Sequence, residues 1–414
     1  MHPTTRPNVM ARSQQHRRFL LYRALSIRAY VPFLLYFLQG RGLSLATVFD
    51  LHVVFILASV VLEVPAGLLA DRRGRRFAMV LGGLLMTTAS VVFILGRSFA
   101  WYSLANALCA FSMALSTAAD SVWLYEQAET SEAYTRAEGY SNAAKSTGNL
   151  LAILVAGAVF SLSPAGPFVL SGALTLLSSV AAYGLVDTHS VAPNRGVLHA
   201  LRSATQLVSD NGRLLLVMAF GAVTFTLLQL SLFADPAHLP MHLDTLNAAE
   251  IALALAALSS AKELLTAITS AATGALFSRA RAAVVVTSVA LGTVAVFVLM
   301  GRQSHATCLV AMLCVAALFG VFQPLERALM NRAITDDQPR ATLFSLESVG
   351  RRLTFAFASA LFGRAAESAS LHGALRATAF LATFAYIILA MGAAGWLSVL
   401  RRKPTQSDPL TSYL

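Results

Sequence analysis

The stretch GLLADRRGRR, from Gly67 to Arg76, is a short charged turn between two long apolar runs. The run before it covers residues 45–70, and the run after it covers residues 77–96. An α-helix needs roughly 20 apolar residues to cross a bilayer, so each run is long enough for one crossing. The arginines of the turn suit the phosphate surface at which such helices end. The segment therefore predicts two membrane-spanning helices joined by a basic loop.

The rest of the 414-residue chain repeats this pattern. Hydrophobic residues make up 57% of the chain and charged residues 12%, whereas a soluble domain has about 25% charged residues. Twelve runs in total predict an all-α membrane protein with twelve transmembrane helices in two six-helix bundles. The ten further apolar runs fall near residues 19–38, 99–124, 140–162, 167–186, 213–234, 248–277, 282–301, 304–329, 341–363 and 371–398.

A polar stretch separates the sixth run from the seventh and marks the boundary between the two bundles. If both termini are cytoplasmic, most Lys and Arg residues fall in the short cytoplasmic segments, as the positive-inside rule requires. The net charge of +11 therefore indicates anionic membrane lipid, and not nucleic acid, as the partner of the basic residues. The predicted organisation is a cytoplasmic tail (1–18), an N-terminal bundle (19–186), a cytoplasmic linker (187–212), a C-terminal bundle (213–398) and a cytoplasmic tail (399–414).

No metal or other cofactor is predicted. The three cysteines lie within apolar runs and lack the spacing of metal ligands. His238 and His242 are four residues apart near external acids such as Asp235, but Pro236 and Pro240 disfavour a helix that would align them. A membrane enzyme with paired acids or histidines at the membrane edge therefore stays only an alternative.

Two pairs of short segments repeat between the halves. GLLADRRGRR has a degenerate counterpart in GALFSRARAA, from Gly274 to Ala283, and each lies between the second and third run of its half. RAEGYS, from Arg136 to Ser141, has a counterpart in RATLFS, from Arg340 to Ser345, at the start of each fifth run. Matching positions in both halves indicate a fold built from parallel repeats.

The charged turn resembles the signature loop of the major facilitator superfamily. EVPAG around Pro65, STAADSVWLYE around Asp120, and QPLERALMNR and RATLFS between Gln323 and Ser345 are similar to one bacterial branch of that superfamily. The resemblance implies a secondary transporter, and not an enzyme, in the bacterial inner membrane. The positions shared with the signature loop are Gly67, Leu69, Ala70, Asp71, Arg72, Gly74, Arg75 and Arg76.

The resemblance also implies that this loop gates transport. Gly67 permits a close helix approach and Gly74 permits a tight turn. Asp71 is implied to contact Arg75, an acid at the end of the fourth helix, for which Glu126 is the candidate, and the start of the eleventh helix. A basic turn without a gating role stays open as the alternative. The predicted gating residues are Gly67, Asp71, Arg72, Gly74, Arg75, Arg76 and Glu126.

Charged residues inside the predicted spans are the candidates for binding solute or protons, because each costs about 2.5–3.5 kcal/mol at a helix centre unless it is compensated. Glu63 precedes Asp71 by about 12 Å of helix, and Arg23 and Arg28 enter the membrane to a similar depth. We therefore expect one of these arginines to meet Glu63. The candidates are Arg23, Arg28, Glu63, Asp120, Lys145, Lys262, Glu263, Glu347, Arg351 and Arg352.

Spacing along a helix predicts partners for some candidates. Glu347 and Arg351 are four residues apart and are placed to form a structural ion pair. Lys262 and Glu263 are adjacent and diverge by about 100°, so we expect separate partners for them.

Alternating access is the predicted mechanism, with a membrane carboxylate coupling transport to protons. Glu63 and Asp120 are the candidates, because desolvation makes a carboxylate bind a proton more readily; a permanent salt bridge is the alternative for each. We expect a monomer that exports a drug or metabolite, with anionic solutes such as a carboxylate siderophore among the candidates. Proton-coupled uptake is the second reading, and a membrane enzyme or a transport-dead sensor is a further alternative.

Overall fold

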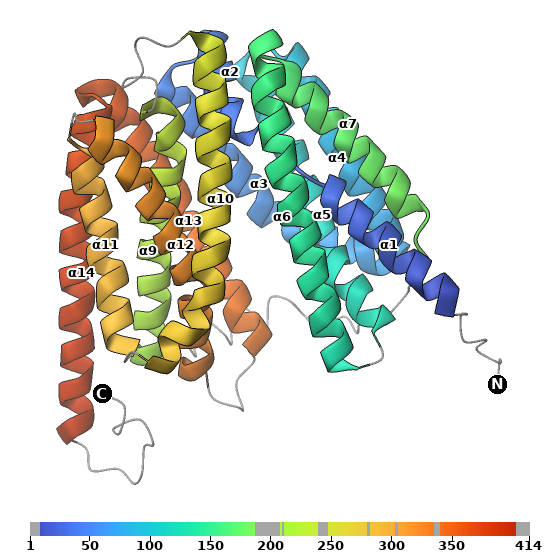
Figure 1. The fold of residues 1–414 in the computed structure, drawn as a ribbon. Coiled ribbons are helices and arrows are strands. Elements are labelled where there is room, and N and C mark those ends of the chain that lie inside the picture. Colours follow the sequence, from blue (N-terminus) through green and yellow to red (C-terminus); the bar gives the residue numbers. More distant parts are fainter. Residues whose placement is uncertain are drawn as a thin grey trace. The chain divides into compact units, whose positions relative to one another are not determined.

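The computed structural model describes residues 9–128, 130–186, 208, 211–238, 247–279, 282–302, 305–334 and 340–402 (Figure 1). Every regular element in these ranges is a helix. Within the same ranges, ten helices are long and apolar enough to cross a membrane. The prediction of an all-α, multi-pass membrane protein is thereby confirmed.

Eleven of the predicted spans appear as single long helices close to their expected positions. Helix α6 begins earlier than expected because Thr130 caps it, with its side-chain Oγ1 accepting a hydrogen bond of 3.1 Å from the backbone N–H of Ala133. The helices are α3 (Leu45–Arg73), α4 (Arg75–Leu95), α5 (Phe99–Gln127), α6 (Ser131–Leu162), α7 (Gly166–Tyr183), α9 (Gly212–His238), α10 (Ala248–Arg279), α11 (Ala282–Met300), α12 (His305–Ala333), α13 (Arg340–Ala369) and α14 (Leu371–Arg402).

The first predicted span is broken, so the expectation of one continuous helix over residues 19–38 is wrong. Helix α1 (Val9–Leu25) begins well before the apolar run, and the chain leaves helical geometry until the 3-10 turn η1 (Val31–Phe33). Helix α2 (Leu34–Gly40) completes the span. Pro32 lies at the start of η1, where its missing N–H and fixed φ favour the beginning of a new helix over the continuation of the old one.

The chain forms two compact units. The N-terminal unit holds α1 to α7, apart from residues Ser44–Asp50 at the start of α3, together with the beginning of α10 as far as Ser260. The C-terminal unit holds residues Ser44–Asp50 and the rest of the helices from α9 onward. Most of the predicted linker lies outside the described residues, so the exact bundle boundaries stay a prediction.

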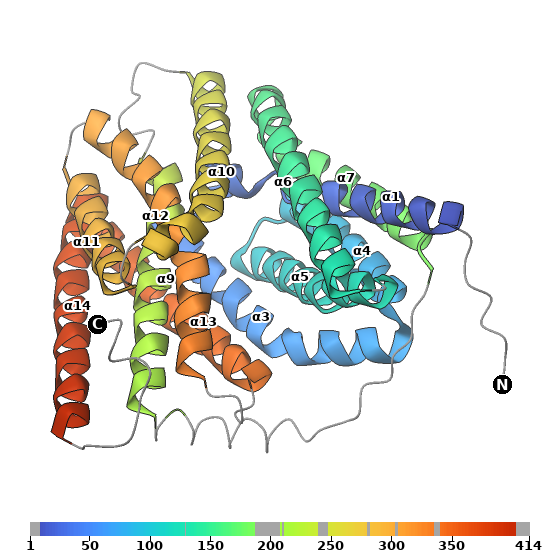
Figure 2. The same cartoon turned by 60° about the horizontal axis from the view of Figure 1, so that its bottom comes forward.

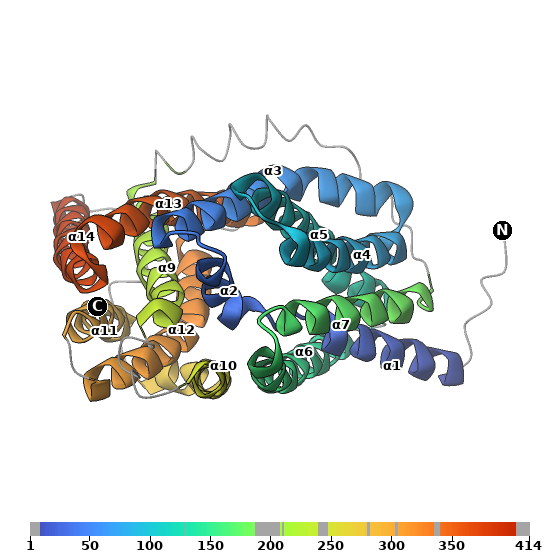
Figure 3. The ribbon, with the colours of Figure 1, turned by 90° about the horizontal axis from the view of Figure 1, so that it is seen from above.

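Tight helix packing holds the N-terminal unit together. Helix α4 packs against α5 and α7, and α1 packs against α6 and α7 (Figure 3). Small residues permit these approaches: a Cβ at Gly83 would lie 2.8 Å from the carbonyl oxygen of Thr175 on α7. The Phe19 and Trp123 rings stack at 4.8 Å and tie α1 to α5. The end of α1 is thereby positioned beside α5 and α6.

The C-terminal unit is organised around α9. This helix packs against α12, α13 and α14, and α9 and α14 lie side by side in Figure 2. The start of α3 also packs within this unit, where the Phe49 and Phe362 rings lie 5.4 Å apart. Helix α13 is long enough to cross a membrane but is not among the ten apolar helices, in keeping with its charged residues Glu347, Arg351 and Arg352.

Candidate functional site

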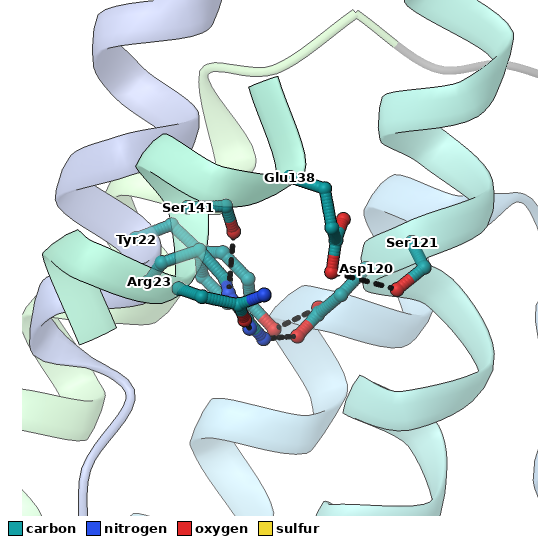
Figure 4. Close-up of polar contacts among 7 residues, drawn as sticks. Tyr22, Arg23, Asp120, Ser121, Glu138 and Ser141 are labelled. Atoms are coloured by element: carbon teal, nitrogen blue, oxygen red, sulfur yellow. Dashed lines mark hydrogen bonds and ion pairs between the residues drawn. The ribbon is translucent and has the colours of Figure 1, made fainter. Parts of the chain in front are cut away.

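The N-terminal unit contains a buried cluster of charged and polar residues from three helices (Figure 4). Arg23, near the end of α1, forms an ion pair with Asp120 on α5. The Tyr22 hydroxyl donates a hydrogen bond of 2.7 Å to Oδ1 of the same carboxylate. On α6, Arg23 Nε donates to Ser141 Oγ at 2.9 Å, and Arg23 Nη2 donates to Asn142 Oδ1 at 3.2 Å. We call Tyr22, Arg23, Asp120, Ser141 and Asn142 the N-terminal cluster.

The charges of the N-terminal cluster balance. Asp120 is only 6% exposed, and each of its two carboxylate oxygens accepts a hydrogen bond. Arg23 supplies one positive charge to this one negative charge, and it has further acceptors on α6. A buried ion pair of this kind is stable when the remaining hydrogen-bonding groups are also satisfied.

Of the two arginines expected to offer Glu63 a partner, Arg23 pairs with Asp120 instead. Helix α1 packs on α6 and α7, so its end faces Asp120 on α5 and not Glu63 on α3. Arg28 lies beyond the end of α1, in the break before η1. Its guanidinium carbon lies 5.7 Å from the ring centroid of Phe55.

A second buried cluster lies in the C-terminal unit. Arg351 Nη1 on α13 donates a hydrogen bond of 2.6 Å to Glu326 Oε2 on α12. Arg351 Nε lies 3.5 Å from Glu347 Oε1, which confirms the ion pair expected one helical turn apart. The guanidinium also lies over the Phe225 ring of α9, 4.5 Å from its centroid. We call Phe225, Glu326, Glu347 and Arg351 the C-terminal cluster.

The C-terminal cluster has two carboxylates for one guanidinium. Glu326 is 4% exposed and Glu347 is 6% exposed. Within the part of the chain that is described, Oε1 of each carboxylate is buried without a hydrogen-bond partner. Gly221 on α9 lets Glu326 approach, because a Cβ there would overlap the Glu326 carboxylate. This cluster therefore differs from the N-terminal one in both charge balance and hydrogen bonding.

Glu326 was not among the predicted site residues, although the sequence contained a signal for it. Asp120 lies 21 residues after Phe99, the first residue of α5, and Glu326 lies 21 residues after His305, the first residue of α12. Both helices have 29 residues and are the fourth of their predicted half. Extending the repeat comparison to these two helices would have paired the two acids.

A third buried ion pair joins Lys262 on α10 to Asp235 on α9. Lys262 therefore has a partner other than Glu263, as its helical angle predicts. Asp235 was expected in the connection after the helix, which is wrong: α9 continues through Pro236 to His238, and Asp235 is 2% exposed. Pro236 lacks the N–H that would bond the Leu232 carbonyl, yet the helix continues through it. His242 lies outside the described residues.

The signature loop contains the expected contacts within the N-terminal unit. Arg75 Nη1 donates a hydrogen bond of 2.6 Å to Asp71 Oδ1, and Arg75 Nε lies 3.9 Å from Glu126 Oε1. Gly74 has a φ of 95°, which confirms the tight turn that favours glycine there. Among the described residues of this unit, a Cβ on Gly67 would meet nothing within 4 Å, so the close approach expected there stays a prediction. The expected contact with the eleventh helix stays a prediction.

The remaining predicted residues lie outside the two clusters as defined above. Arg72 lies in the last turn of α3, and the Arg76 guanidinium lies 5.8 Å from the Tyr183 ring centroid. Lys145 on α6 acts electrostatically on Asp120 of the N-terminal cluster. Three charged candidates lie on other long helices: Glu63 on α3, Glu263 on α10 and Arg352 on α13.

Comparisons with known proteins agree with this fold. The family model described as Major Facilitator Superfamily matches residues 20–359. The chain therefore belongs to the major facilitator superfamily. It is a multi-pass membrane transporter and not an enzyme, and its cargo class is a small molecule. No curated protein sequence matches the chain.

Several solved transporters share the fold at low sequence identity. A mutant of the nucleoside transporter NupG superposes with a TM-score of 0.77 at 12% identity, over 92% of this chain and 99% of that one. A bacterial homolog of the human lysosomal transporter Spinster, in an inward-facing and unoccupied conformation, has a TM-score of 0.68 at 16% identity, over 95% and 99%. A POT family transporter in complex with 5-aminolevulinic acid has a TM-score of 0.68 at 12% identity, over 95% and 98%.

Proposed function

We propose that this transporter couples export of a small organic solute to proton movement by alternating access, as a monomer in a bacterial inner membrane with both termini in the cytoplasm. The observation that carries the proposal is the charge balance of the C-terminal cluster, where Glu326 and Glu347 share Arg351. One guanidinium neutralises only one carboxylate, and an uncompensated buried charge is costly.

A proton bound to the C-terminal cluster would remove both of its deficits. It would neutralise the second carboxylate, and it would supply a donor to a carboxylate oxygen that has no hydrogen bond. Loss of that proton would restore the excess negative charge and favour exposure of the cluster to water. Protonation and deprotonation are therefore expected to favour different conformations, which is the basis of coupling.

The N-terminal cluster is proposed as a permanent structural pair and not as the proton carrier. Both Asp120 oxygens already accept hydrogen bonds, and Arg23 balances the carboxylate charge. Adding a proton there would break the ion pair without relieving any excess charge. This assignment moves the coupling role from Glu63 or Asp120, as the sequence suggested, to Glu326 and Glu347.

The same cluster would serve either direction of transport: in export the solute and the proton cross the membrane in opposite directions, and in uptake they cross in the same direction. Export is proposed, and uptake is the alternative. The test is a metabolite and drug accumulation profile in deletion and overexpressing cells, with and without collapse of the proton gradient. A solute retained by deletion cells and expelled in a gradient-dependent way supports export; a solute that fails to enter them supports uptake.

The same cells test the proton carrier once a solute is known. Glu326→Gln should abolish the dependence of transport on the gradient. Glu250→Gln is the matched control, because it makes the same change outside the C-terminal cluster. Glu250 caps the start of α10, where it accepts a hydrogen bond of 2.8 Å from the Asn247 backbone N–H. This variant should keep the dependence on the gradient. No gradient-sensitive solute, or full proton dependence in Glu326→Gln, would contradict the proposed coupling.

Gating by the signature loop is proposed separately. Asp71 is held by Arg75, which also approaches Glu126, so the carboxylate is fixed at the end of α3. Asp71→Asn should leave membrane insertion unchanged and lower the transport rate severalfold, because the amide lacks the charge that a helix N-terminus would attract. Wild-type flux in a variant that inserts normally would remove the loop from the mechanism.

A further inference from the structure

We propose that Arg28 and the break between α1 and η1 bind the oxyanion group of an organic solute, such as the carboxylate of an aromatic acid. The inference rests on the proposed transport function and specifies the class of solute. It concerns a site within the N-terminal unit, separate from the N-terminal cluster.

Arg28 differs from the paired cations of the membrane helices. Arg23, Lys262 and Arg351 each contact a buried carboxylate. Arg28 has no acidic partner within the described residues: its guanidinium lies over the Phe55 ring and interacts with the neutral Tyr30 hydroxyl. A cation within a membrane span is expected to face a partner or a wet cavity. An anionic ligand would provide the missing partner.

The backbone at the break provides further donors. Helix α1 ends at Leu25, and η1 begins only at Val31. In the described part of the chain, no backbone carbonyl accepts a hydrogen bond from the N–H groups of Arg28 and Ala29. Ala29 is 0% exposed, and a buried N–H without an acceptor is unfavourable. The guanidinium and the two N–H groups belong to the same short segment, and donors of these two kinds bind oxyanions in proteins.

The break is held firmly in position. The Tyr30 backbone N–H donates a hydrogen bond of 3.2 Å to Ser171 Oγ on α7. The Tyr30 ring stacks on Phe168 at 4.8 Å, and its hydroxyl lies 3.1 Å from Cys109 Sγ on α5. Arg28 is therefore presented from an anchored segment, which lowers the entropy lost on binding a ligand.

An aromatic surface lies next to the guanidinium. The Phe55 ring, 5.7 Å from the Arg28 guanidinium carbon, is stacked with the His52 ring at a centroid distance of 5.7 Å and an angle of 22°. Both rings lie on α3. A flat apolar body attached to the oxyanion would find a surface of matching chemistry there, which favours an aromatic carboxylate over a small inorganic anion.

The test is equilibrium binding to the purified full-length protein in detergent, with benzoate and its neutral isostere benzamide as probes. Wild type should bind benzoate more tightly than benzamide. Arg28→Gln should weaken benzoate binding by about tenfold or more, the effect expected for a hydrogen bond to a charged group, and should leave benzamide binding unchanged.

Arg41→Gln is the matched control. Arg41 also lies over a phenylalanine ring, 4.9 Å from the Phe37 centroid, but its guanidinium donates to the carbonyls of Gly96 and Ile94. It should bind benzoate like wild type. If Arg28→Gln does not fold, Arg28→Lys replaces it: the charge remains, the planar fork is lost, and benzoate binding should weaken severalfold.

Three results would overturn the proposal: no preference of wild type for benzoate, equal loss in the Arg41 control, or displacement of benzoate by anionic phospholipid but by no other soluble aromatic acid. The last would identify lipid headgroups as the occupant. Binding at equilibrium needs no proton gradient. A protein that binds benzoate through Arg28 but shows no proton coupling would therefore contradict only the proposed coupling.

Discussion

The two buried clusters have a similar frame and different charges. Each places a carboxylate at the same position of a 29-residue helix, Asp120 on α5 and Glu326 on α12. Asp120 meets one guanidinium and a tyrosine hydroxyl, whereas Glu326 shares its guanidinium with Glu347. Two similar halves can therefore differ in charge: Asp120 is neutralised by its own arginine, whereas Glu326 and Glu347 together carry one negative charge more than Arg351 neutralises.

The cation reaches the acid by a different route in each half. Arg23 comes from the first helix of the N-terminal unit, and Arg351 comes from the fifth helix of its predicted half. In the C-terminal unit the first helix, α9, contributes Gly221 and Phe225, which make room for Glu326 and cover Arg351. A repeated backbone therefore constrains where the acid lies but not which helix neutralises it.

The largest difference is expected in transport. Glu326→Gln should reduce gradient-driven transport to the level of protein-free liposomes while solute exchange continues, because the proton-binding charge is gone. Asp120→Asn should slow transport but keep its proton dependence. The measurement is flux of the solute found by cellular profiling, in proteoliposomes with and without a pH gradient. Loss of proton dependence in Asp120→Asn alone would reverse the roles of the two clusters.

Removing each cation should affect stability to different extents. Arg351→Gln leaves two uncompensated carboxylates and should cost about 3–5 kcal/mol at pH 8. Acid should restore part of this stability, because protonation neutralises the carboxylates that Arg351 no longer balances. Arg23→Gln leaves only Asp120, which keeps the Tyr22 hydrogen bond, and should cost about 1–3 kcal/mol.

Thermal unfolding of both arginine variants in detergent at pH 5 and pH 8 measures this difference. Equal losses for the two variants, or a loss for Arg351→Gln that does not change with pH, would contradict the unequal charge balance.

A glycine on α6 tests the N-terminal cluster alone. A Cβ at Gly148 would lie 3.0 Å from Ala24 Cα and would overlap the Ala24 carbonyl, so Gly148→Ala should push α1 from α6 and cost about 1–3 kcal/mol. Gly139→Ala on the same helix is the control, because a Cβ there meets nothing within 4 Å. Thermal unfolding measures both variants; an equal effect would show that α1 is not packed this closely on α6.

The smallest effect is expected from the hydroxyl group of Tyr386, for which the hydroxyl group of Tyr22 is the comparison. Tyr22→Phe removes the hydrogen bond to Asp120 and should cost about 1.5–3 kcal/mol, because the acceptor is charged. Tyr386→Phe in the C-terminal unit removes a neutral contact of 3.0 Å with Thr224 and should cost about 1 kcal/mol. Both are read from thermal unfolding; a smaller loss for Tyr22→Phe would argue that Asp120 does not depend on Tyr22.

Local sequence was sufficient to predict the class of protein and most of its helices. Apolar run length determines which segments cross a bilayer, and the Gly74 turn with its arginines follows from φ preference and charge. The Glu347–Arg351 pair was predictable for the same reason, since its two residues lie one turn apart on a single helix.

Tertiary structure decided the partners that lie far apart in the chain. Arg23 met Asp120 and not Glu63 because α1 packs on α6 and α7, and helix faces in contact cannot be read from hydropathy. Arg28 lies outside any helix, and not in the continuous span expected over residues 19–38, because the chain breaks before Pro32. Membrane helices expose apolar faces to lipid and to one another alike, so pattern alone does not distinguish a helix contact from a lipid contact, and only packing brings Glu326 to Arg351.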